Sequence, residues 1–116
     1  MFVAVVPVFS SQLPAKQTKT ENETVSYSCI TRAKPAATVL WKLDGKNLTA
    51  ETSPYNFSVS VAPISQSKLL RTLSYLTINR VSWRENGNFS CLAYNDAGEK
   101  GLSTELEVRC EYRTVL

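Results

Sequence analysis

Apolar and polar residues alternate along most of this chain with the period of two that is typical of a β-strand with one buried face. In TVSYSCI (24–30), Val25, Tyr27 and Cys29 share one face and serines occupy the other. The same spacing, with β-branched and aromatic residues, recurs in five further runs: 37–43, 55–61, 73–78, 88–94 and 102–108. Helical spacing is not kept for three turns anywhere. The pattern therefore predicts an all-β protein.

Turn residues separate these runs. Asp44-Gly45 predicts a tight turn, and Asn95-Asp96-Ala97-Gly98 predicts a hairpin. Short strands joined by polar turns favour an antiparallel β-sandwich. The first residues, MFVAVVPVF, are expected to form an apolar edge strand. A leftover signal fragment is the alternative, although no basic segment precedes the run and Pro7 interrupts it.

Composition narrows the class of protein. The 116 residues suit one domain, and the net charge of +3 comes from lysines and arginines that are scattered rather than gathered into a stripe, so nucleic acid is not an expected partner. A run of 18 apolar residues is absent, so any membrane attachment would need an anchor in a parent protein outside this chain.

The residue types also argue against catalysis. The chain has no histidine, which removes Ser-His-Asp and Cys-His pairs and nearly every catalytic zinc site. It has no glycine-rich phosphate loop and no clustered carboxylates. We therefore expect no enzyme, no cofactor, no metal and no small-molecule substrate. Binding of a partner through the protein surface is the class of function that remains.

Two of the three cysteines have a structural interpretation. Cys29 and Cys91 fall on inward faces together with Trp41, and Phe89 shares the face of Cys91. This spacing is that of a disulfide joining two sheets over a buried indole. Such a bond would close a loop of about 60 residues and contribute roughly 4 kcal/mol in the chain-entropy account. A metal-binding or redox role for these cysteines would be expected to include a C-x-x-C motif or histidine, and the chain has neither.

Four features then resemble the intermediate set of the immunoglobulin superfamily. They are Cys29, Trp41, the block LTINRVSWRENGNFSC (76–91) and the NDAG hairpin (95–98), and together they cover about residues 7–109. The chain departs from the family pattern twice. Glu85 stands where an aspartate is usual, and Phe89 replaces the tyrosine whose hydroxyl braces the corner before the second cysteine.

The resemblance implies an extracellular domain of a cell-surface receptor. It would mediate cell-cell adhesion or recognition, with the same molecule on an opposing cell or with another cell-surface protein. Two alternatives stay open: a structural spacer in a multi-domain receptor or matrix protein, and an intracellular muscle-type domain. The expected disulfide weighs against the muscle type, because cytosolic thiols stay reduced.

Alternation also predicts a binding surface. It places Leu40, Leu92 and Tyr94 on the outer side of neighbouring strands, where an apolar and aromatic patch could serve as an interface. The alternative is that single exposed leucines are ordinary, or that a bend covers them.

Four Asn-x-Ser/Thr sequons point to the secretory route: Asn22, Asn47, Asn56 and Asn88. Asn88 is expected on the same sheet face as the patch, so a glycan there would restrict binding to the far end of that face or move it to the other sheet.

We expect a lead-in at 1–6, the immunoglobulin-like domain at 7–109 and a linker toward a following domain at 110–116. Cys110 falls in the linker as an unpaired cysteine. It could tether a partner, remain a free thiol, or belong to a bond with a part of the protein beyond this chain.

Overall fold

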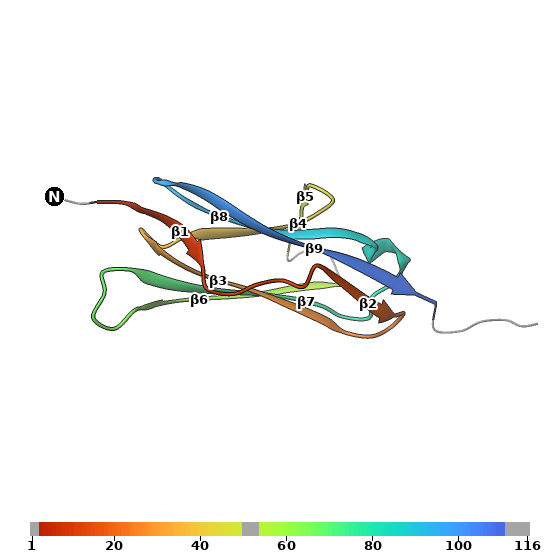
Figure 1. The fold of residues 1–116 in the computed structure, drawn as a ribbon. Helices are drawn as coiled ribbons and strands as arrows, with labels where there is room; N and C mark the ends of the chain where they lie inside the picture. The colour runs from red at the N-terminus through yellow and green to blue at the C-terminus, as the bar shows by residue number, and fades with distance from the viewer. Residues whose placement is uncertain (1–2, 50–53, 111–116) are drawn as a thin grey trace, which may run out of the picture.

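The computed structural model describes residues 3–49 and 54–110; residues 1–2, 50–53 and 111–116, which include most of the expected linker, lie outside the description. Nine strands form two sheets packed face to face (Figure 1). The four-stranded sheet has the order β1-β3-β7-β6, and the five-stranded sheet has the order β2-β9-β8-β4-β5. The strand bounds are β1 Val5–Phe9, β2 Lys16–Thr20, β3 Val25–Lys34, β4 Thr38–Leu43, β5 Lys46–Asn47, β6 Tyr55–Pro63, β7 Leu70–Ile78, β8 Gly87–Asn95 and β9 Gly98–Arg109.

All six predicted runs form strands of this sandwich. β3 and β4 begin one residue later than predicted, and the other four strands begin at or before the predicted residue. The turn at Asp44-Gly45 has positive φ at both residues, 49° and 84°, as a tight hairpin turn requires. The predicted all-β sandwich is confirmed. No helix in the described part of the chain is long and apolar enough to cross a membrane.

The N-terminal segment divides between the two sheets. β1 pairs antiparallel with β3, while β2 pairs parallel with β9. β1 starts at Val5, so the last residues of the expected lead-in already belong to the sandwich. β2 was not predicted, because KQTKT carries no apolar alternation and lies at the edge of its sheet.

The centre of the sandwich is the predicted disulfide with its indole. Cys29 on β3 and Cys91 on β8 form the bond between the sheets, and both are fully buried. Trp41 is 3% exposed, and its indole N–H donates a hydrogen bond to the Oγ of Ser74 at 2.8 Å. Phe89 is fully buried, with its ring centroid 5.8 Å from that of Tyr27. The core is thus built from side chains of both sheets.

A short 3-10 helix, η1 (Trp83–Glu85), lies at the corner before the second cysteine, where Phe89 has no hydroxyl. Ser82 and Glu85 form a capping box, in which the Ser82 backbone N–H donates to Glu85 Oε1 at 2.8 Å. Asn86 then joins the corner to β9, because its Oδ1 accepts a 2.6 Å hydrogen bond from the N–H of Val108. A capping box and an asparagine therefore fix the corner that Phe89 cannot brace.

β6 departs from its sequence pattern. Alternation places Val59 and Val61 on the same side as buried Tyr55, yet they are 59% and 51% exposed. The reason lies in the opposite sheet, whose edge strand β5 is only two residues long and pairs only with Lys42 and Leu43 of β4. The inward side of β6 is therefore covered near Tyr55 and open toward Pro63.

The indole hydrogen bond generates a stability prediction. Ser74→Ala should lower the free energy of unfolding by about 1–3 kcal/mol, because it leaves the buried indole N–H of Trp41 without an acceptor. Denaturant titration followed by tryptophan fluorescence measures this loss. Ser58→Ala, on the exposed side of β6, is the matched control and should be near neutral. Equal stability of the two variants would contradict the prediction.

Candidate functional site

Strand register brings the three predicted surface residues together on the outer face of the five-stranded sheet, between its centre and the β8–β9 hairpin. Leu40 on β4 lies directly opposite Leu92 on β8, and Tyr94 lies opposite Thr38. Tyr94 is 39% exposed, whereas Leu40 and Leu92 are each half-buried. Leu40 and Leu92 form a cross-strand pair on the outer face, so the patch is more compact than three isolated exposed side chains.

A glycine continues this row across the sheet. Gly101 on β9 pairs with Leu92, and a Cβ at position 101 would lie 3.8 Å from Leu92 Cδ1. Because glycine has no side chain, the flank of Leu92 that faces β9 is left open. The next pair on the same face toward the hairpin is Tyr94 with Glu99. We call Leu40, Leu92, Tyr94 and Gly101 the outer-face patch.

The hairpin beside this patch is held by an asparagine that the sequence analysis treated only as a turn residue. The Nδ2 of Asn95 donates to the carbonyl oxygen of Val5 at 2.8 Å and to that of Pro35 at 3.0 Å. One side chain thereby joins β1, the loop after β3 and the β8–β9 hairpin. The end of the sheet that carries the outer-face patch is thus fixed by specific hydrogen bonds, and only the fold could show this.

Three of the sequons, Asn22, Asn56 and Asn88, lie on segments at the end of the sandwich where η1 and the end of β9 lie (Figure 1), whereas Asn47 lies opposite Lys42, two residues from Leu40 on the outer face. Asn88 opens β8 and pairs with Glu105, Asn47 ends β5, Asn56 opens β6, and Asn22 occupies the turn after β2. All four are exposed. On the sheet face shared with the patch, Asn88 is four residues from Leu92, or roughly 13 Å along the strand.

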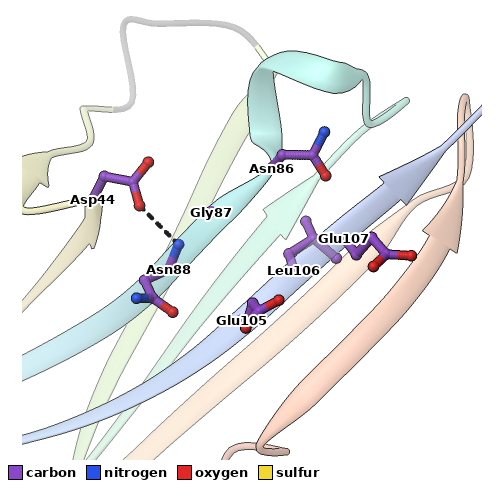
Figure 2. Close-up of a pocket in the computed structure, with 7 residues that line it drawn as sticks. All are labelled: Asp44, Asn86, Gly87, Asn88, Glu105, Leu106 and Glu107. Atoms are coloured by element: carbon purple, nitrogen blue, oxygen red, sulfur yellow. Dashed lines mark hydrogen bonds between the residues drawn. The ribbon is translucent and has the colours of Figure 1, made fainter.

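A shallow hollow of about 260 Å³ surrounds Asn88 (Figure 2). Its lining residues are Asp44, Asn86, Gly87, Asn88, Glu105, Leu106 and Glu107. Asp44 Oδ1 accepts a 2.9 Å hydrogen bond from the backbone N–H of Asn88, and the Asp44 N–H donates to the Asn88 carbonyl oxygen at 2.8 Å. The Asp44-Gly45 turn is thereby fastened to the start of β8.

The glutamates on the rim of this hollow are paired with cations. Lys16 Nζ lies 3.5 Å from Glu105 Oε2 and 3.1 Å from Glu107 Oε1, and Arg109 also contacts Glu107. The hydrogen bond from Arg109, followed by that from Lys16, lowers the pKa of Glu107, and Glu107 in turn raises the pKa of Lys16. These exposed pairs connect β2 to β9 and leave an ordinary solvated surface.

Titratable groups inside the sandwich show no acid-base arrangement. Burial raises the pKa of Tyr27 to about 12 and also raises the pKa of Tyr55, with a smaller contribution from the negative charge of Glu85. Both phenols are therefore neutral at physiological pH. Within the described ranges, no three His, Cys, Asp or Glu residues are placed to hold a metal ion.

Two further exposed residues lie near the η1 end. Cys110 is exposed and has no disulfide partner among the described residues. Trp83 is 67% exposed, and the guanidinium of Arg84 lies 5.2 Å from its ring centroid. The sequence analysis did not single out Trp83, whose position after the capping serine gave no periodic signal.

Gly87 generates a prediction about the hollow. Its φ is +147°, and an added Cβ would come within 2.5 Å of Asp44 Oδ2, so Gly87→Ala should destabilise the domain by about 1–3 kcal/mol. Gly101→Ala is the matched control, because that site has no positive φ and only ordinary contacts, and its stability should change little. Thermal unfolding of both variants checks this; a Gly87→Ala protein as stable as the parent would contradict it.

Comparison with known proteins places this sandwich in a family. The sequence model described as "Immunoglobulin domain" matches residues 7–95. Among curated proteins, the Zwei Ig domain protein zig-4 of Caenorhabditis elegans is 30% identical over 113 residues, covering 92% of this chain and 40% of that protein. Mouse Hemicentin-2 is 32% identical over 88 residues, covering 76% of this chain and 2% of that protein. The chain therefore spans less than half the length of these relatives.

Solved structures show the same fold. A variant of titin domains I67–I69 superposes with a TM-score of 0.76 at 25% identity, covering 92% of this chain and 34% of that one. Extracellular domains 3–5 of Drosophila OTK give a TM-score of 0.72 at 24% identity, covering 91% of this chain and 32% of that one. With the inter-sheet disulfide over its buried indole and the matched residues 7–95, the chain belongs to the immunoglobulin domain family.

Proposed function

We propose that this chain is an extracellular domain of the intermediate set that mediates cell-cell adhesion or recognition through the outer-face patch. The observation that carries the proposal is the cross-strand pair of Leu40 and Leu92, with exposed Tyr94 beside it, on the outer face of the five-stranded sheet. Asn88 lies four residues from Leu92 along β8, whereas Asn47 lies opposite Lys42, two residues from Leu40. A glycan at Asn47 would therefore border the patch on its Leu40 side and leave the Leu92 and Tyr94 side accessible.

The chemistry of the patch suits a protein partner. A tyrosine and a leucine pair present apolar area on a rigid sheet, and polar groups of Thr38 and Glu99 lie on the strand positions opposite Tyr94. Apolar and aromatic centres with polar rims are typical of protein interfaces. The partner would be the same molecule on an opposing cell or another cell-surface protein.

An extracellular location is supported by three independent features. The Cys29–Cys91 disulfide persists in oxidising compartments, and the four sequons are exposed as glycosylation requires. Relatives by sequence include fibroblast growth factor receptor 1 of Xenopus laevis, 24% identical over 106 residues.

Leu92→Asp should reduce binding through the patch by about tenfold or more, because a charge at the centre of an apolar contact must be desolvated when the partner docks. Beads coated with the domain would report homophilic binding by aggregation, and a fluorescent tetramer of the domain would report binding to cells. Half-burial of Leu92 on the outer face lets the variant fold, which thermal unfolding confirms.

Ser103→Asp is the control for this experiment, since Ser103 is exposed on β9 of the same face, outside the patch. It should bind like the parent. If Leu92→Asp also binds like the parent, the patch is not the interface. If the parent binds neither beads nor any of a panel of cells, the domain serves as a spacer.

Sequon occupancy tests the extracellular part of the proposal on its own. After secretory expression, intact mass spectrometry should show added mass that an N-glycosidase removes, and peptide mapping should locate it at Asn22, Asn47, Asn56 or Asn88. The matched control is a protein with all four asparagines changed to glutamine, which should carry none of this mass. An unmodified parent protein would overturn this part of the proposal.

A further inference from the structure

The exposed edge of β6 has backbone groups that point away from the sandwich. β6 lies at one end of the four-stranded sheet, with β7 as its single neighbour in the strand order. At the two ends of the β6–β7 ladder, the Asn79 N–H donates to the Pro54 carbonyl and the Ile64 N–H donates to the Leu69 carbonyl. The residues of the β6 segment that form these two bonds, Pro54 and Ile64, are both even-numbered. The register of β6 with β7 has no shift between them.

Antiparallel ladders alternate, so the even-numbered residues of β6 bond to β7 and the odd-numbered ones turn their N–H and C=O groups to the other side. Phe57, Val59 and Val61 therefore present these groups along the free edge. Their side chains also share the open inward side described above, where Val59 and Phe57 border a slot of about 160 Å³ against β4. Unpaired backbone and exposed apolar side chains thus coincide on one strand.

The other three sheet edges are protected, and β6 is not. β1 contains Pro7 and a register shift between Val5 and Val8, β2 carries Lys16 and Lys19, and β5 is two residues long. Proline, irregular pairing, lysine and shortness are the usual means by which proteins prevent edge-to-edge association. The nine residues of β6, YNFSVSVAP, contain no charged side chain and have proline only at the last position.

We propose that the β6 edge binds a second copy of this chain, so that two four-stranded sheets become one continuous sheet across a two-fold axis. A strand that pairs antiparallel with its own copy is self-complementary by symmetry, and an uncharged strand brings no like charges together. With the axis at Val59, each Val59 faces its counterpart and each Phe57 faces the second copy's Val61. These are aromatic and β-branched cross-strand pairs of the stabilising kind.

The sequons do not obstruct this arrangement. Asn56 is an even-numbered residue of β6, so its exposed side chain projects from the outer face of the sheet and not from the edge. The inference rests on the backbone edge of β6 and not on the outer-face patch, which lies on the other sheet. Leu40 of the patch also lines the slot with Phe57 and Val59, whereas Leu92 and Tyr94 do not line it.

The test measures self-association and backbone protection together. All proteins carry Cys110→Ser, so that the exposed thiol cannot form an intermolecular disulfide. Sedimentation velocity from micromolar to millimolar concentration should show a reversible dimer. Hydrogen exchange followed by NMR should show that the amides of Phe57, Val59 and Val61 become protected as concentration rises, while those of Ser58 and Ser60 are protected throughout.

Val59→Lys should weaken the dimer by about tenfold or more, because the two-fold axis places the two lysines directly opposite one another. Ser58→Lys, with the same charge on the outer face of the same strand, should dimerise like the parent. Val61→Lys provides a second edge variant, and thermal unfolding confirms that each protein is folded.

Three results would overturn the inference: a monomer at every concentration, edge amides whose exchange does not depend on concentration, or a Val59→Lys protein that dimerises as well as the parent. A dimer lost in Leu92→Asp and retained in Val59→Lys would assign self-association to the outer-face patch instead. A dimer retained in Leu92→Asp and lost in Val59→Lys supports the β6 edge.

Discussion

The bond between Cys29 and Cys91, with the indole of Trp41 beside it, is the interaction around which the other elements are arranged. It joins β3 of one sheet to β8 of the other, and Trp41 ties the same layer to β7 through Ser74. Because the covalent link and the indole occupy the centre, the inward residues of the long strands have fixed partners. The polar corners at Asn86 and Asn95 then hold the two ends of the sandwich to this centre.

Because side chains fill the core, a binding function would use the outer surface of the molecule. The outer surface is not uniform. The sequon at Asn88 lies toward the η1 end, where the rim of the hollow is made of paired charges, while the sequon at Asn47 lies opposite Lys42, beside Leu40 of the outer-face patch. A physical consequence is that a glycan at Asn47 would limit a protein partner to the Leu92 and Tyr94 side of the patch.

The two sheets also end differently at their edges. Proline, lysine or short length protects β1, β2 and β5, whereas the uncharged β6 exposes two valines beside unpaired backbone groups. The valines are exposed because β5 stops after two residues and does not cover the inward side of β6. The open edge and the outer-face patch differ in chemistry, since backbone hydrogen bonds govern the first and side-chain packing governs the second, although Leu40 lines the slot beside Phe57 and Val59.

The sequence by itself determined the sandwich, its six main strands and its disulfide, because period-two alternation and the positions of Cys29, Trp41 and Cys91 are local or one-dimensional signals. It also identified Leu40, Leu92 and Tyr94 as outward residues. Tertiary structure alone decided that Leu40 pairs with Leu92, that Asn47 lies opposite Lys42 beside them, and that Val59 and Val61 stay exposed despite their inward alternation. The physical reason is that alternation specifies which side of a strand a residue takes, whereas the cover on that side comes from the length and register of strands distant in sequence.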